Sequence, residues 1–178
     1  MTSAITRLIA LFDSRLVTLD ALLATAVQQQ GEEKATALLG ARLTPDMFPL
    51  GRQISIAGNL ARQFTQWCAG EEISTTDSDI ATLAEAHAHI AQVRQLLAAV
   101  KADDSQLDKV KEMKLPGDMR FNFSGRDYAD EWLLPNFYFH LVTAYNILRA
   151  NGVEIGKRDY MAHLMPTIMQ QMAAAQGA

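Results

Sequence analysis

The chain has few of the residues that would tie it to an extracellular, membrane or nucleic-acid setting. Its single cysteine, Cys68, excludes an internal disulfide and a thiolate metal cluster. Its 16 Lys and Arg are outnumbered by 20 Asp and Glu, which argues against nucleic acid as a main partner because phosphate binding needs clustered basic residues. No apolar run approaches the roughly 20 residues of a membrane span, and the first residues lack a signal-peptide pattern. We therefore expect a cytoplasmic protein with no membrane segment and no nucleic-acid partner.

The sequence also lacks the short motifs that identify common enzyme classes. It contains no Gly-rich phosphate loop, no nucleophile elbow and no pair of catalytic carboxylates. Any activity must therefore be argued from isolated polar residues in apolar helices. Whether the protein is an enzyme stays open on sequence grounds.

What the sequence does have is helical periodicity. Apolar residues make up 49% of the 178 residues, enough for one domain with its own core. They recur at three- and four-residue steps, which predicts amphipathic helices over about 5–30, 47–69 and 80–102. The second helix has Pro49 in its first turn and is expected to stop at Gly70. Asp46 is the expected N-cap of the second helix, and Thr76 with the acid three positions later resembles a capping box before the third.

A different pattern follows the third helix. Residues 110–115 and 119–123 look like two short strands around a Pro-Gly turn, and so small a hairpin must lean on the helices. Ser124 is the expected cap of a fourth long helix, in which Pro135 introduces a kink before an Asn151-Gly152 stop. No repeat or linker interrupts the chain. The sequence therefore predicts an all-α fold, an antiparallel four-helix bundle with a short β-hairpin before the fourth long helix, as a single domain over residues 1–178.

Two blocks of the sequence carry a family resemblance. One runs from Leu134-Pro-Asn-Phe-Tyr-Phe-His140 through Asn151-Gly152-Val to Gly156-Lys-Arg-Asp159, and the other is Leu43-Thr-Pro-Asp-Met-Phe-Pro-Leu50 with Arg52-Gln53. They resemble an uncharacterised bacterial family, a domain of unknown function within the DinB/YfiT-like superfamily of inferred metalloenzymes. The resemblance spans most of the chain. It implies a DinB-like bundle, often dimeric, and some relatives in the wider group are thiol-dependent transferases or isomerases.

The same resemblance implies where a metal would be held. The wider group binds a divalent ion with three histidines, one from the second helix and two from an H-x-x-x-H pair in the fourth. His140 matches the second member of that pair, but the first is Asn136, and the second-helix positions around Gln53 contain no histidine. Amide oxygens are weak ligands for zinc or nickel. We therefore expect no tight metal site and no cofactor, and a divalent ion at His140 is the less favoured alternative.

A small-ligand pocket in the bundle is the favoured hypothesis. Its candidate residues are Asn136, His140, Tyr145, Arg52 and Gln53. His140 is either a pocket histidine that titrates near neutrality, or a buried neutral histidine hydrogen-bonded to Asn136 or Tyr145. Asn136 either orients a substrate carbonyl or satisfies a helix carbonyl freed by the proline.

Arg52 also has two possible uses. It follows a first-turn proline on a helix expected to face the fourth one, where a guanidinium can hold a substrate acid with two hydrogen bonds. It can equally form an ion pair with Asp46 or Glu131 at the edge of the bundle. The ion pair is the favoured interpretation.

The remaining reactive side chains favour structural roles. His87 and His89 project roughly 200° apart on a helix, so they cannot chelate one ion together, and we expect a core histidine and a surface histidine. Cys68 lies near a helix C-terminus, where the dipole disfavours a thiolate, so we interpret it as structural. Four of the eight methionines fall in the last helix and suggest an adaptable apolar face, used for core packing or self-association.

Two functions remain open. The favoured one is a metal-free homodimer that binds an unknown small molecule in a pocket around His140. The alternative is a divergent DinB/YfiT-like metal-dependent enzyme of the thiol transferase or isomerase type, in which His140 is the surviving ligand or a base. The sequence gives no ligand, no dimer face and no pathway.

Overall fold

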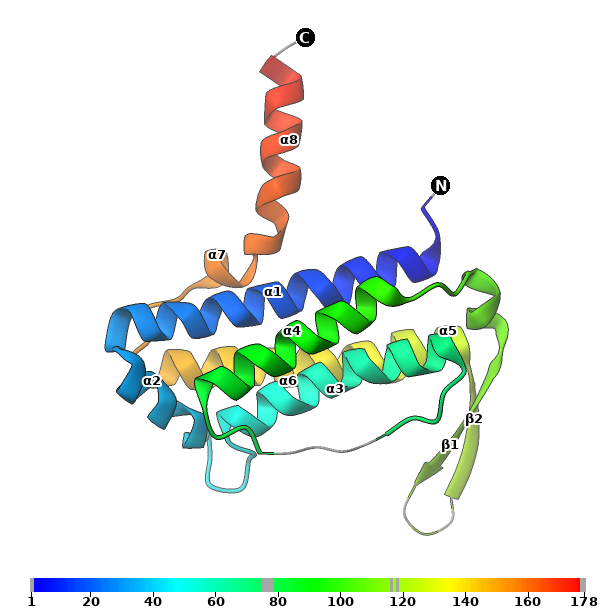
Figure 1. Ribbon diagram of the computed structural model, residues 1–178, viewed down its shortest axis with the longest axis horizontal. Coiled ribbons are helices and arrows are strands. Elements are labelled where there is room, and N and C mark those ends of the chain that lie inside the picture. Colours follow the sequence, from blue (N-terminus) through cyan, green and yellow to red (C-terminus); the bar gives the residue numbers. More distant parts are fainter. Residues whose placement is uncertain (1, 75–78, 116, 118, 177–178) are drawn as a thin grey trace.

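Four long helices form the central bundle of the molecule, a computed structural model shown in Figure 1. They are α1 (Ala4–Gln30), α3 (Leu50–Ala69), α4 (Leu83–Ala99) and α6 (Leu134–Ala150). The predicted all-α bundle with one hairpin before its last long helix is confirmed. The structure describes residues 2–74, 79–115, 117 and 119–176.

The four helices pack in a ring. The helix α3 lies between α6 and α4, and α1 lies between α4 and α6. In Figure 1, α3 and α4 both run toward the hairpin, whereas α1 and α6 run the opposite way. The neighbours α3 and α6 are therefore antiparallel, as are α1 and α4. Two short helical segments, α2 (Glu32–Ala37) and η1 (Leu38–Gly40), lie between α1 and α3.

Aromatic rings from three helices meet at the centre of the bundle. Phe12 of α1 lies 5.4 Å from Phe64 of α3 and 5.0 Å from Phe137 of α6, measured between ring centroids. All three are fully buried. Tilted and edge-on pairs of this kind add to the free energy of simple area burial. The periodic apolar residues that predicted these helices therefore form one shared core.

Single glycines with a positive φ angle end two of the long helices. Gly70 ends α3 in the left-handed conformation at φ 70°, and its N–H group bonds back to the last turn. Gly152 follows the end of α6 at φ 82°. Only glycine adopts such angles without steric cost, which explains why the sequence predicted both stops correctly.

The N-terminus of α1 is capped by a residue far along the chain. Asp104, in the short helix η2 (Asp104–Asp108), accepts hydrogen bonds from the backbone N–H groups of Ala4 at 2.9 Å and Ile5 at 3.0 Å. The Ser3 hydroxyl donates to the same carboxylate at 2.7 Å. These three donors hold the pKa of Asp104 at about 2, below the usual 3.8.

Two predicted caps differ in the structure. The capping box of α4 is formed by Thr82 and Glu85, whose side chains each bond the other's backbone N–H. The expected Thr76 lies outside the described residues. Pro49, not Asp46, is the N-cap of α3. Asp46 instead accepts a hydrogen bond from Thr44 at 2.6 Å in the preceding turn, because such short acids also stabilise turns through local hydrogen bonds.

The hairpin consists of β1 (Val110–Leu115) and β2 (Met119–Ser124), paired antiparallel with Met113 opposite Phe121. Pro116 and Asp118 of the expected turn lie outside the described residues. The hairpin leans on the bundle as predicted, since Phe123 of β2 packs on Trp132 with ring centroids 6.5 Å apart.

Ser124 then begins the fourth helix, accepting a hydrogen bond from the Asp127 N–H at 3.0 Å, which confirms it as the cap. The first turn is α5 (Gly125–Asp127), and η3 (Tyr128–Leu133) follows as a π-helical turn that ends two residues before Pro135. Because proline lacks an N–H group, the helix cannot continue its regular bonding through this point. The irregularity predicted at Pro135 takes the form of this widened turn.

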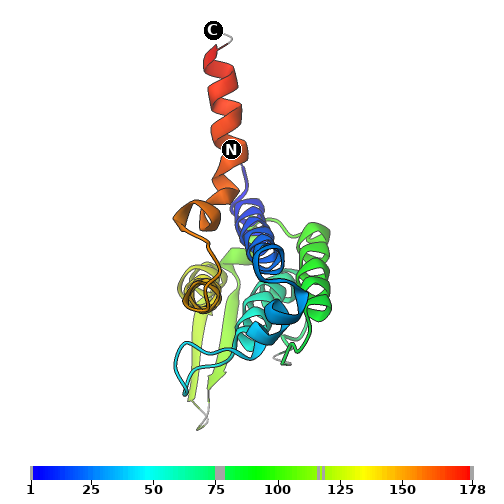
Figure 2. The ribbon, with the colours of Figure 1, turned by 90° about the vertical axis from the view of Figure 1, so that its left-hand side faces the viewer.

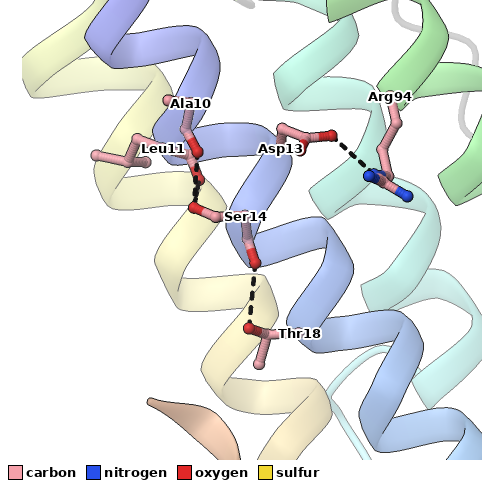
Figure 3. Close-up of polar contacts among 6 residues, drawn as sticks. All are labelled: Ala10, Leu11, Asp13, Ser14, Thr18 and Arg94. Carbon is pink, nitrogen blue, oxygen red and sulfur yellow. Dashed lines mark hydrogen bonds and ion pairs between the residues drawn. The ribbon is translucent and has the colours of Figure 1, made fainter. Parts of the chain in front are cut away.

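The seam between α1 and α4 is held by an ion pair and a hydrogen bond between side chains. Arg94 Nε lies 2.7 Å from Asp13 Oδ1, and His87 Nδ1 lies 2.6 Å from Asp20 Oδ1. The partners are seven residues apart on each helix, which matches two turns of an antiparallel pair. Figure 3 shows the first pair, together with Ser14 and Thr18, whose hydroxyls donate to carbonyls of their own helix.

The C-terminal part leaves the bundle. The short helices α7 (Lys157–Tyr160) and η4 (Ala162–Leu164) lie against α1. The helix α8 (Met165–Gln176) then projects away from the four-helix body, as the two views in Figures 1 and 2 show. Within the described residues, no helix combines the length and apolar character needed to cross a membrane.

Candidate functional site

His140 and Gln53 join α6 to α3 through a short hydrogen bond. His140 Nδ1 lies 2.6 Å from Gln53 Oε1, and the Gln53 amide nitrogen donates to the Phe48 carbonyl at 3.0 Å. The second bond fixes the orientation of the amide, so its oxygen faces the imidazole. An amide oxygen only accepts hydrogen bonds, so Nδ1 of His140 is the donor. The neutral ring therefore carries its proton on Nδ1 and has its acceptor nitrogen at Nε2.

This arrangement differs from the sequence expectation for His140. The sequence suggested Asn136 or Tyr145 as the hydrogen-bond partner, whereas the bond at Nδ1 goes to Gln53. The Gln53 side chain is buried on α3, where an unpaired amide would be costly, so the imidazole satisfies it. Two of the five predicted site residues are thus brought into direct contact.

Asn136 lies one helical turn before His140 on the same face of the fourth helix. Its amide nitrogen donates to the Trp132 carbonyl at 2.7 Å. The interpretation from sequence was a bond to the carbonyl freed by the proline, which at regular α-helical spacing is that of Glu131, so the observed bond goes to the neighbouring carbonyl instead. The Asn136 side-chain oxygen receives no hydrogen bond from the residues that the structure describes. It is therefore available to accept one from a bound molecule.

Asn136 and His140 line a groove of about 600 Å³ between α3, the fourth helix and β1. Its apolar walls are contributed by Leu60, Trp132 and Met113. Trp132 is presented by the π-helical turn η3, and such turns recur at functional sites because they displace side chains from the regular helical positions. The volume lies within the usual range for small-molecule sites.

Lys111 of β1 supplies a positive charge to the same groove. Its ammonium lies 5.8 Å from the ring centre of Tyr128 and 6.0 Å from that of Trp67. Glu72 and Glu112 also line the groove, but no carboxylate of the described chain lies within ion-pair distance of the Lys111 ammonium. Glu112 pairs with Arg120 at 3.2 Å. Aromatic faces partly compensate a desolvated ammonium, and an anion would complete its environment.

Tyr128 remains a neutral phenol at the wall of this groove. Burial raises the pKa of the Tyr128 hydroxyl far above its usual value of 10. The hydroxyl donates to Gln63 Oε1 at a long 3.5 Å. Tyr128 therefore contributes an apolar face and a weak hydrogen-bond donor, not a base.

Two of the predicted site residues lie elsewhere. Arg52 Nη1 lies 3.5 Å from Asp79 Oδ1, and its guanidinium sits 5.5 Å from the centre of the Phe48 ring. The favoured ion pair is thus present, but with Asp79 instead of Asp46 or Glu131. The loop before α4 brings Asp79 to the start of α3, which no local pattern predicts. Tyr145 packs on Tyr160 of α7, with ring centroids 5.8 Å apart, outside the groove.

The donor atoms near His140 do not fit the metal site that the superfamily implies. Within the described ranges, no group of three His, Cys, Asp or Glu side chains is placed to hold an ion. The nitrogen Nδ1 of His140 and the oxygen of Gln53 already bond each other. Asn136 could add only an amide oxygen, which is a weak ligand for zinc or nickel.

The other reactive side chains are packed against the bundle. His87 is half exposed and paired with Asp20, instead of lying in the core. His89, expected at the surface, is only half exposed and lies on Gly58 of α3, with Nε2 3.2 Å from the Ser55 carbonyl. Glycine at position 58 makes room for this ring, so the apolar pattern alone could not place it.

Cys68 fits its structural interpretation. Burial raises the pKa of its thiol to about 12, so almost no thiolate exists at neutral pH.

The sequence interpretation missed the aromatic and basic part of the groove. Lys111, Trp132 and Tyr128 come from a strand and from an irregular turn, and their side chains carry no local motif. The only available signal was the expectation that the hairpin must lean on the helices, because it placed some part of the strands against the bundle.

Comparisons with known proteins agree with this fold. A family model described as a domain of unknown function, DUF1993, matches residues 6–161. A crystal structure of a DinB family member protein from Shewanella denitrificans is 33% identical, with a TM-score of 0.75 over 85% of this chain and 88% of that one. No curated protein matches significantly. Since the family model covers most of the sequence, the chain belongs to the DUF1993 family of domains of unknown function.

Proposed function

We propose that this protein is a cytoplasmic, metal-free homodimer that binds a small molecule in the groove between α3, the fourth helix and β1. One observation carries the proposal. His140, Asn136 and Lys111 all line a cavity of about 600 Å³ that also has aromatic walls. Apolar walls with a few convergent polar groups are the usual composition of a small-molecule site.

The groove favours a ligand with an anionic end and an apolar body. Glu72, Glu112 and Lys114 also line the groove, but Glu112 contacts Lys114 and Arg120. The Lys111 ammonium has no ion-pair partner among the described residues, so it would attract a carboxylate or a similar anion. Trp132 and Met113 offer apolar contact area next to it. The Asn136 oxygen would accept a hydrogen bond from a hydroxyl or amide of the ligand. A small aromatic or aliphatic carboxylic acid combines these features.

The direct test is a thermal-shift screen of small carboxylic acids with the full-length protein. A ligand present at 100 times its Kd stabilises the folded state by about 2.7 kcal/mol, which raises Tm by several degrees. We expect the shift to disappear in Lys111→Gln and His140→Ala. Lys109→Gln is the matched control, because this exposed lysine directly precedes β1 and does not line the groove. Equal shifts in all variants would place the binding site elsewhere.

The alternative, a divergent metal-dependent enzyme, has one observation in its favour. The hydrogen bond from His140 Nδ1 to Gln53 sets the ring tautomer in the way that outer-sphere partners orient metal-binding histidines. Metal analysis of protein purified without an affinity tag separates the two candidates. About one divalent ion per chain supports the enzyme. No bound ion, with an unchanged Tm after adding zinc, nickel or manganese, supports the metal-free binding protein.

A further inference from the structure

The helix α8 is the least covered element of the fold. Its main contact is with η4, directly before it, and it stands away from the four-helix body in both views of Figures 1 and 2. Its exposed apolar side chains recur at helical spacing and share one stripe with the end of η4. They are Leu164, Met165, Ile168, Met169 and Met172.

A helix of this kind requires a partner surface. Isolated helices of about 12 residues are marginal in water, because most helix stability in proteins comes from packing an apolar face. The sequence of α8 contains no charged residue, so neither anionic lipid nor nucleic acid would be attracted to it. Methionine side chains adapt to irregular apolar surfaces, which favours a protein surface as the partner.

The same chain carries a second uncovered apolar surface, on the outer face of α6. Phe139 is 57% exposed and Val142 is 38% exposed. Beside Val142, a pit of about 180 Å³ opens between Tyr145 and Tyr160. A flexible methionine side chain could fill a pit of this size. The stretches 139–146 and 165–172 each rise about 10 Å along their helices, so the two surfaces match in length.

We propose that α8 of each copy docks on the outer face of α6 in a second copy, so that two chains exchange their C-terminal helices. This inference rests on the homodimer in the proposed function and names its interface. A stable interface buries roughly 800 Å² and 20–30 residues on each partner. One helix of 12 residues supplies about half of that, whereas reciprocal exchange gives every copy both a donated helix and a receiving face.

The mass of the full-length protein in solution tests the donated helix. By light scattering after size exclusion, we expect wild type at twice the chain mass of 19.6 kDa. The double variant Met169→Glu, Met172→Glu should elute as a monomer, because it places two charges in an apolar interface. The matched control, Gln170→Glu with Ala174→Glu, adds the same charge on the opposite side of α8 and should stay dimeric.

A second pair of variants tests the outer face of α6, on which α8 of the other copy is proposed to dock. Val142→Glu on α6 should also give a monomer. Leu96→Glu on α4 is the control, because Leu96 is likewise 38% exposed but lies on a helix that does not adjoin α6 in the ring. Circular dichroism of each variant verifies that the monomer is folded.

Cross-linking separates exchange from folding back on the same chain. Met169→Cys and Val142→Cys chains are oxidised separately and as a mixture. Exchange predicts a covalent dimer several-fold more abundant in the mixture, while Cys68 contributes little because burial raises its thiol pKa to about 12. A doubly substituted chain that instead closes an internal disulfide would overturn the exchange.

The outcomes distinguish this inference from the proposed function. A monomeric wild type would overturn both the homodimer and the helix exchange, while the groove would still be judged by its ligand screen. A dimer that survives the Met169→Glu, Met172→Glu substitutions would overturn the exchange alone. A monomer whose α8 binds vesicles of neutral phospholipid would show a membrane partner and would also overturn it.

Discussion

Polar side chains on the two sides of the bundle differ in the partners that they contact. On the α1–α4 seam, Asp13 and Asp20 each meet a basic partner from the other helix. On the α3–α6 side, Gln53 and His140 satisfy each other, but the Lys111 ammonium lies over aromatic rings without an ion-pair partner among the described residues. Paired polar groups at a seam set the register of two helices. Polar groups left available over a cavity mark the place where another molecule would complete the hydrogen bonding.

The largest expected effect comes from the core that both sides share. Phe137→Ala removes a fully buried ring that contacts Phe12, and such truncations cost about 3–5 kcal/mol of unfolding free energy. Urea unfolding monitored by circular dichroism measures the loss. Phe48→Ala is the control, because Phe48 is about half exposed and should cost less than about 1 kcal/mol. Equal losses would mean that the core is not centred on these rings.

A smaller effect is expected where α3 meets α4. A Cβ atom added at Gly58 would lie 2.2 Å from His89 Nε2, so Gly58→Ala forces the ring to move. Overpacking of this kind costs about 1–3 kcal/mol, measured as the change in unfolding free energy. The double variant with His89→Ala should recover part of the loss. Strictly additive losses in this cycle would contradict a direct contact.

The third effect depends on pH and concerns the cap of α1. Because the folded-state pKa of Asp104 is lowered from 3.8 to about 2, its contribution to stability is complete above about pH 4. That contribution is lost as the pH falls from about 4 to about 2, where the carboxylate becomes protonated in the folded state as well. Asp104→Asn should therefore lower Tm at pH 7 and approach wild type near pH 2. A Tm difference independent of pH would contradict this role.

The smallest expected changes in stability concern the Asp13–Arg94 pair at the α1–α4 seam and Lys111 in the groove. The Asp13–Arg94 pair is partly exposed, so a double-mutant cycle with Asp13→Asn and Arg94→Gln should give a coupling of only about 0.2–1 kcal/mol that weakens with added salt. Lys111→Gln should change stability by about 1 kcal/mol or less but abolish ligand-induced stabilisation. A large stability loss at Lys111 would make it a structural residue and remove the contrast between the two sides.

Most of the fold follows from local patterns, whereas the site follows only in part. Gly70, Gly152 and Ser124 act through their own backbone or their nearest neighbours, so their roles as stops and cap were predicted. Gln53 and His140 were both named as candidates, but their contact depends on how two antiparallel helices align. Arg52 and Tyr145 were named for the same pocket and lie outside it, because neither spacing nor composition shows which way a helix faces.

The sequence alone determined the helices, the hairpin and the single histidine on the inner part of α6, because these depend on periodicity and on the preferences of individual residues. Only the tertiary structure decided which polar groups meet. Asp104 caps a helix that begins about 100 residues earlier, His89 finds room on Gly58, and Lys111 reaches the groove of His140 from a strand. Such contacts join residues far apart in the chain, and their geometry is set by helix packing, which no local pattern encodes.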